Sequence, residues 1–113
     1  MIINGKQFDF NINKADYAER YKTALHKMIA AGEDAKKKIA AGEISEVSAT
    51  IETYREFLHD ATGVYLIDET EDDVITAEGI YYDFLEQVAE QREEREKLRR
   101  ERLAKYKRMK EKV

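Results

Sequence analysis

Apolar residues recur at helical spacing along the C-terminal third of the chain, in a run from about Ile75 to Met109. This run contains no Pro and no Gly after Gly79, and up to Val88 its apolar positions follow steps of three and four, as in a helix with one buried face. From Glu90 onward charged residues dominate, although the residue types still favour a helix. The pattern predicts one long helix whose second half has too little apolar surface to bury itself in its own domain.

The first twelve residues have the pattern of a β-hairpin. Asn4-Gly5 is a strong two-residue turn signal, because a type I′ turn needs positive φ at both positions. The resulting register places five apolar side chains on one face: Met1, Ile3, Phe8, Phe10 and Ile12. A lone hairpin is only marginally stable in water. We therefore expect this face either to cover the core of its own domain or to pair with another chain.

Two further helices are expected between the hairpin and the long helix. The first is expected to begin with Asn13 as its N-cap, to continue through Gly32 and to end near Ala41. The second is expected to begin at Ser45 and to stop at Gly63. Because the connection between them is short, the two helices should form an antiparallel pair.

The apolar run at 64–67 is expected to be a strand or an extended segment packed on the helices. Residues 68–73 are acidic and favour the start of the third helix, since acids are stabilising near a helix N-terminus. The predicted fold class is mainly α, with an N-terminal β-hairpin packed on a three-helix bundle and a long charged C-terminal helix extending from it. Residues 1–90 would form the hairpin and helical domain, and residues 91–113 a charged, basic helical extension.

Charge is divided unevenly along the chain. The formal net charge is −4, but residues 97–113 hold nine Lys or Arg against two Glu, a net charge of +7. Residues 1–96 hold eleven basic against twenty-two acidic residues, a net charge of −11. An acidic body with a basic tail indicates either an acidic partner for the tail or contact between the bodies and tails of different copies. A homo-oligomer is therefore one of the expected states.

The composition also restricts the setting in which the protein acts. The absence of Cys removes disulfides and thiol chemistry and fits a reducing compartment. The start of the chain is too short and too polar for a signal peptide, and no apolar run approaches the roughly 18 residues of a membrane helix. We expect no membrane association.

Few residues are candidates for chemistry. Glu56 and His59 have the Glu-x-x-His spacing of helical di-metal sites, but such sites need a second motif of this kind, and Thr23 stands three residues before His26. Residues 68–79 begin like a calcium loop, but they have Asp73 at the sixth position and Gly79 at the twelfth, where such a loop requires Gly and Glu. Both serines lie at a helix start, which gives little support to a serine nucleophile. We expect no enzyme activity, no cofactor and no bound metal.

The basic tail has three interpretations. It can be a solvated helix stabilised by ion pairs one turn apart, such as Glu93 with Lys97. It can bind nucleic acid, although the acidic body and the interleaved glutamates argue against that. It can also be a partner helix with a thin apolar seam, which consists of Leu98, Leu103, Tyr106 and Met109.

Several short stretches carry a resemblance to a known kind of protein. They are the hairpin at 1–12, the segments DYAERY at 16–21, YREFLH at 54–59 and YYDFL at 81–85, and the tail that holds AKY at 104–106. With this layout the chain resembles small proteins encoded among the tail genes of tailed phages and prophages, near the tape-measure gene, which look like tail assembly chaperones. Such proteins are thought to coat the tape-measure protein until tail-tube subunits replace them.

The resemblance implies a non-enzymatic chaperone or morphogenesis factor in the cytoplasm of the bacterial host, with tape-measure or tube proteins as partners. The expected partner-binding residues are those of the hairpin face and the seam: Ile3, Phe8, Phe10, Leu98, Leu103, Tyr106 and Met109. The alternative is a phage-encoded inhibitor of a host nuclease or other defence protein, whose acidic surface would mimic nucleic acid. A nucleic-acid-binding role for the basic tail is the third and least favoured hypothesis.

Overall fold

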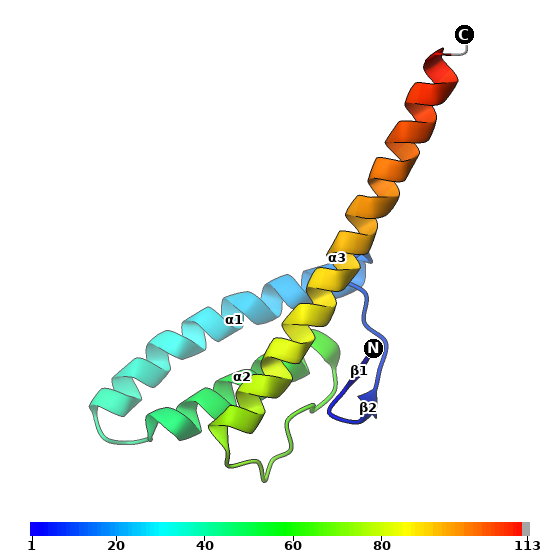
Figure 1. Cartoon of the computed structure of the whole chain (residues 1–113). Helices are drawn as coiled ribbons and strands as arrows, with labels where there is room; N and C mark the ends of the chain where they lie inside the picture. The colour runs from blue at the N-terminus through cyan, green and yellow to red at the C-terminus, as the bar shows by residue number, and fades with distance from the viewer. Residues whose placement is uncertain (112–113) are drawn as a thin grey trace.

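The chain folds into a short β-hairpin and three helices, the last of which projects from the body (Figure 1). This computed structural model describes residues 1–111. The elements are β1 (Ile2–Ile3), β2 (Lys6–Gln7), α1 (Ala15–Ala40), α2 (Glu46–Thr62) and α3 (Val74–Glu111). The predicted fold class is therefore confirmed: a mainly helical chain with an N-terminal antiparallel hairpin and three helices.

The hairpin has the predicted turn and register. Asn4 and Gly5 both have positive φ, at 50° and 72°, as a type I′ turn requires. Met1 faces Phe8 through two backbone hydrogen bonds, because each donates its N–H to the carbonyl of the other at 3.0 Å. The two-residue turn therefore fixes which side chains share a face.

The apolar face of the hairpin covers the core of the same chain. Ile3, Phe8 and Phe10 are only 1, 8 and 5 % exposed. This is the first of the two arrangements expected for the hairpin face. A partner-binding role for these three residues stays a prediction, and it would require the hairpin to leave the body, because their side chains are buried against it.

The ends of α1 differ from the prediction at one point. Asn13 is not the N-cap, because that position is held by Lys14, which makes no side-chain capping bond. The amide of Asn13 instead donates to the backbone carbonyl of Gln91 in α3, at 2.9 Å. At the other end, Gly42 adopts a φ of 74° and closes the helix with a Schellman arrangement of backbone hydrogen bonds.

The ends of α2 agree with the prediction. The Ser45 hydroxyl accepts a hydrogen bond from the backbone N–H of Ser48 at 3.0 Å, and Gly63 ends the helix with a φ of 77°. Residues 64–67 form an irregular segment with bends at residues 64 and 67 and without strand pairing, in which Leu66 and Ile67 are fully buried. These two side chains anchor the connection to α3 on the core.

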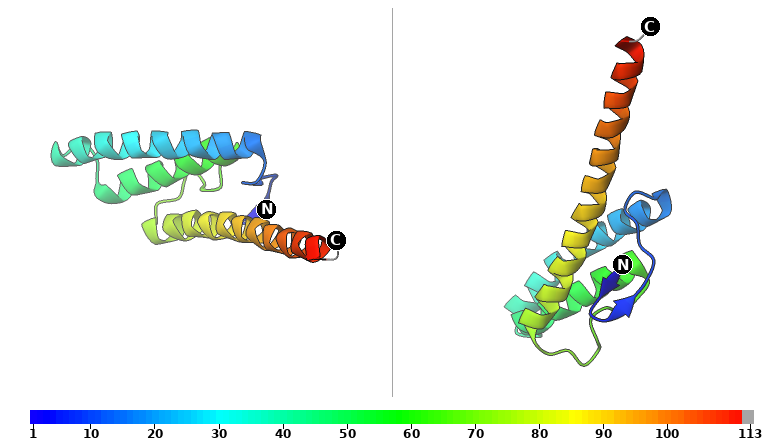
Figure 2. Two further views of the ribbon diagram at one scale, coloured as in Figure 1. Left: turned by 90° about the horizontal axis from the view of Figure 1, so that it is seen from above. Right: turned by 45° about the vertical axis from the view of Figure 1, so that its right-hand side comes forward.

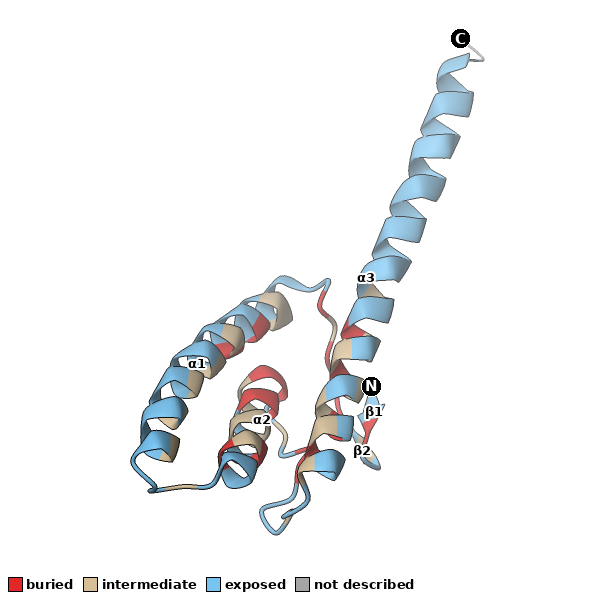
Figure 3. Ribbon diagram, turned by 60° about the vertical axis from the view of Figure 1, so that its left-hand side comes forward, coloured by how far each residue is buried: buried red, intermediate tan, exposed pale blue. Residues whose placement is uncertain are grey.

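Helix α2 packs against both α1 and α3, and the hairpin lies beside α3 (Figures 1 and 2). The core is rich in aromatic rings, with Phe84 of α3 in contact with Phe10, Tyr21 and Phe57. Buried positions are confined to the body, and the outer half of α3 is exposed throughout (Figure 3). The molecule is consequently elongated, with extents of 71 × 29 × 22 Å.

Candidate protein-binding surface

One face of α3 runs from the core into solvent. Its first part holds the buried residues of the helix, which are Ala77, Ile80, Phe84 and Val88. Continuing at steps of three and four residues, the same face carries Gln91, Arg95, Leu98, Arg102, Tyr106 and Met109. The seam residues Leu98, Tyr106 and Met109 therefore extend the packing face of the body, whereas Leu103 lies toward one side of it.

Gln91 marks the point where the body ends. Its side-chain oxygen accepts the backbone N–H of Ile12 at 2.9 Å, and its amide donates to the carbonyl of Phe10 at 2.8 Å. One turn earlier, the amide of Gln87 donates to the carbonyl of Ile2 at 3.0 Å. These bonds satisfy backbone groups of the N-terminal segment and fix the direction in which α3 leaves the body.

Beyond Gln91 the described part of α3 is exposed on every side, from Arg92 to Glu111. Leu98, Leu103, Tyr106 and Met109 are between 45 and 68 % exposed. Scattered exposed apolar residues are ordinary, but four within three helical turns form a connected strip. The four seam residues are thus accessible on an extended helix.

An open groove lies where α3 leaves the body, between the outer half of α3 and the segment that joins the hairpin to α1. Its volume is about 690 Å³, and it is lined by Asn11, Asn13, Glu94, Arg95, Leu98, Arg99, Arg102, Leu103 and Tyr106. The structure thereby brings together three of the four seam residues, while Met109 lies farther along the helix. Three arginines and one glutamate surround the apolar side chains, so the groove favours an acidic ligand. Arg and Tyr are also the residue types that dominate binding energy at protein interfaces.

The ion pairs of the tail are weak. Arg99 approaches Glu96 at 3.1 Å and Arg95 approaches it at 3.9 Å, and all three side chains are exposed. These contacts replace the pairs one turn apart that were expected, such as Glu93 with Lys97. Exposed pairs of this kind contribute from about 0 to 1 kcal/mol and exchange readily for other partners. The arginines of the tail are therefore available to an acidic ligand.

The candidate metal ligands lie on one turn of α2. Ligand atoms of Glu56, His59 and Asp60 fall within 4.8 Å of one another, so Asp60 joins the pair that the sequence had singled out. The imidazole of His59 stacks on Tyr65, with ring centroids 3.8 Å apart and planes within 6°. Stacking on a ring gives this histidine a packing role that requires no ion.

The acidic connection at 68–73 is organised by an arginine. The guanidinium of Arg55 donates to the backbone carbonyl of Asp68 at 2.8 Å and, at 3.4 Å, to the carbonyls of Glu69 and Glu71. A calcium ion would bind such a loop through oxygens, and here a guanidinium already uses its carbonyls. The loop is thus held by the chain's own cation.

Two stacked tyrosines at the junction of α2 and α3 have a shifted acidity. Tyr54 and Tyr81 stack with their ring centroids 4.1 Å apart. Burial raises the pKa of both phenols above the ordinary value of 10.0, and neighbouring groups, including Tyr82 for both, add to the effect. The stacked rings pack the junction of α2 and α3.

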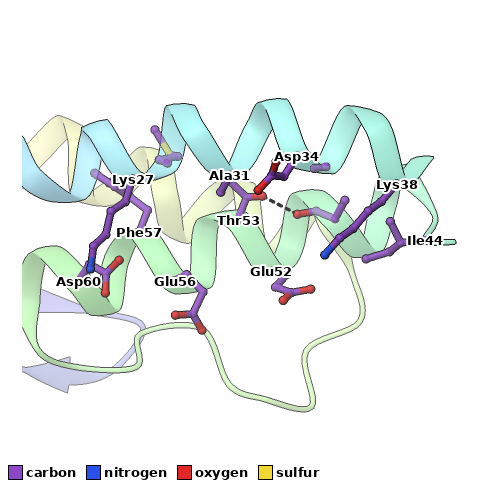
Figure 4. Close-up of a pocket in the computed structure, with 13 residues that line it drawn as sticks. Lys27, Ala31, Asp34, Lys38, Ile44, Glu52, Thr53, Glu56, Phe57 and Asp60 are labelled. Atoms are coloured by element: carbon purple, nitrogen blue, oxygen red, sulfur yellow. Dashed lines mark hydrogen bonds between the residues drawn. The ribbon is translucent and has the colours of Figure 1, made fainter. Parts of the chain in front are cut away.

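A second groove, which was not predicted from the sequence, lies between α1 and α2 (Figure 4). Its volume is about 240 Å³. Acidic residues at its edge are Asp34, Glu52, Glu56 and Asp60, and apolar residues within it are Met28, Ala31, Ala35, Ile44, Ala49 and Phe57. The signal that could have revealed it is the set of small alanines on the facing sides of the two helices, because small side chains leave space between backbones.

Comparison of the chain with family models, curated proteins and solved structures finds no match in any of the three. The candidate surface is therefore characterised by its own geometry and charge. Within residues 1–111, no helix has both the length and the apolar composition that crossing a membrane requires.

Proposed function

We propose that this chain is a non-enzymatic assembly factor of a phage or prophage tail, acting in the cytoplasm of the bacterial host, and that it holds a helical tail protein along the outer half of α3. The observation that carries the proposal is the continuous face of α3. This face packs the core as far as Val88 and then continues uncovered past Leu98 to Met109. A face that is packed in one half and exposed in the other is suited to a helix supplied by a partner.

The chemistry of the groove supports one kind of partner. A helix lying beside α3 would bury Leu98 and Tyr106 and would bring its flanks close to Arg95, Arg99 and Arg102. The partner is therefore an amphipathic helix with an apolar stripe and acidic flanks. Long helices of a tape-measure protein, which need to be kept soluble before the tail tube forms, are the clients that the resemblance suggests.

Several polar side chains near the candidate chemistry have structural roles, which supports a binding role for the chain. The hydroxyl of Ser45 caps α2, and the ring of His59 stacks on Tyr65. Arg55 holds the loop at 68–71. None of these groups combines a nucleophile with an adjacent base, which acyl or phosphoryl transfer would need.

The experiment that tests this function is affinity capture of the tagged protein from cells producing the phage, with partners identified by mass spectrometry. We expect recovery of a long helical tail protein. Leu98→Asp should weaken its binding about 30-fold, since truncating or charging a central interface residue typically costs about 2 kcal/mol or more. Ala104→Asp is the matched control, because Ala104 is exposed on the opposite side of the same helix and acquires the same charge.

Two outcomes would contradict this function. Unchanged capture of the tail protein by Leu98→Asp and by Tyr106→Asp would show that the seam is not the binding surface. Recovery of a host nuclease or defence protein in place of a tail protein would favour the inhibitor hypothesis, in which the acidic body mimics nucleic acid. That complex should weaken steeply with salt and survive removal of residues 97–113.

A further inference from the structure

We propose that the basic tail of one copy docks in the acidic groove between α1 and α2 of a second copy. The inference goes beyond the proposed function, because it concerns the association of two copies of this chain. It does not depend on which protein binds along α3. It depends on two surfaces described above, the groove of Figure 4 and the outer half of α3.

The groove presents an acidic line beside an apolar floor. Glu52, Glu56 and Asp60 follow one another at steps of four residues along α2, so they share a face and span about 12 Å at the helical rise of 1.5 Å per residue. Apolar side chains, including Met28 of α1 and Ile44, line the groove together with these acids. Lys27 and Lys38 also line the groove, and the four acids leave it with an excess of negative charge.

The tail presents the complementary pattern. Arg95, Arg99 and Arg102 stand around Leu98 and span about 10.5 Å along α3, which matches the acidic line. The exposed side chain of Leu98 or of Tyr106 can enter the apolar part of the groove, whose 240 Å³ is enough for one large side chain. Opposite charges flanking matched apolar surfaces give both attraction and a defined orientation.

The contact cannot form within one chain. Helix α3 is continuous from Val74 to Glu111, and its free end points away from the turn that joins α1 to α2 (Figures 1 and 2). A tail can therefore reach only the groove of another copy. If two copies exchange tails, a closed dimer forms; if they associate head to tail, longer chains form. In either case the groove of the second copy covers the seam until a partner protein binds the seam in its place.

The test is sedimentation or light scattering over a range of protein concentrations. At low salt the wild-type protein should associate, and at high salt it should become monomeric, because exposed charges are screened. Glu52→Lys with Glu56→Lys should raise the apparent dissociation constant about tenfold or more, as should Arg99→Glu with Arg102→Glu. Mixing the two double variants should restore association, since the reversed tail then meets the reversed groove.

A control separates local complementarity from net charge. Glu69→Lys with Asp72→Lys changes the total charge by the same amount as the groove variant, at exposed positions outside the groove, and should leave association intact. A wild-type protein that stays monomeric at low salt and high concentration would overturn the proposal. So would association that resists the groove variant but is lost with the tail, because tail would then bind tail.

The same groove variant distinguishes this proposal from the proposed function. Glu52→Lys with Glu56→Lys should lose self-association and still capture the tail protein, because its seam is unchanged. Leu98→Asp should lose the client whether or not the protein associates with itself. The two proposals can therefore be tested separately, and one can fail while the other holds.

Discussion

At the scale of single residues, Gln91 decides where the body stops and the tail begins. Gln91 lies on the face of α3 that carries the buried apolar residues, three positions after the last of them, Val88. At Gln91 this face changes from apolar to polar. The segment from Phe10 to Ile12 has no strand beside it, so its backbone groups need partners from elsewhere. The side chain of Gln91 supplies them, with an acceptor for Ile12 and a donor for Phe10.

Gln91→Ala should lower the free energy of unfolding by about 1–3 kcal/mol, the usual cost of leaving partly buried backbone groups without a hydrogen bond. Denaturant unfolding measures this change, and faster hydrogen exchange of the Ile12 amide locates it. Glu90→Ala is the control, because Glu90 is the exposed neighbour on the same helix. It should change the stability by less than about 0.5 kcal/mol. Equal effects of the two substitutions would mean that the hydrogen bonds of Gln91 do not hold the junction.

At the scale of elements, α3 consists of two functional halves within one helix. The first half is fixed by buried side chains such as Phe84 and Val88 and by the amides of Gln87 and Gln91. The second half has no buried residue and depends on the intrinsic helical preference of its composition. A helix that starts from a packed first half avoids the cost of nucleation, so its exposed extension can remain helical.

Deleting residues 97–113 should leave the stability of the body within about 0.5 kcal/mol of the full chain, because every residue from 97 to 111 is exposed. The measurement is denaturant unfolding of dilute protein at high salt, together with a loss of helical circular dichroism from the missing turns. A chain ending at Leu85 lacks Val88 and Gln91 and should be strongly destabilised. If the shorter deletion destabilises the body to a similar extent, then the tail packs on it in solution.

At the scale of the whole molecule, shape and charge are distributed along the same axis. The radius of gyration is 18.8 Å, whereas a compact domain of this length would have about 13 Å. The negative charge is concentrated in the body and the positive charge in the projecting tail. This separation of charge is the basis of the proposed association between copies at low salt, because the extended helix keeps the basic tail away from the acidic body of its own chain.

Small-angle X-ray scattering at high salt should therefore give a radius of gyration near 18.8 Å for the monomer. The chain without residues 97–113 should give a markedly smaller value, since it loses the projecting helix and keeps the body. A value near 13 Å for the full chain would mean that α3 bends back onto the body. That result would also remove the geometric reason for contact between different copies.

The sequence by itself determined the features that depend on near neighbours in the chain. The Asn4-Gly5 turn set the hairpin register, Ser45 and Gly63 set the bounds of α2, and the charge division placed a basic helix after an acidic body. Each of these follows from local geometry or composition. The exposed seam from Leu98 to Met109 followed in the same way, because charged neighbours on a helix leave no face to bury.

The tertiary structure alone decided which surfaces are covered. It buried Ile3, Phe8 and Phe10, which had been expected at a partner interface, and it used Asn13 as a donor to α3 in place of a cap. It also opened the acidic groove between α1 and α2. The physical reason is common to all of these: an apolar or polar face can be recognised along one element, but what covers it depends on how distant elements pack.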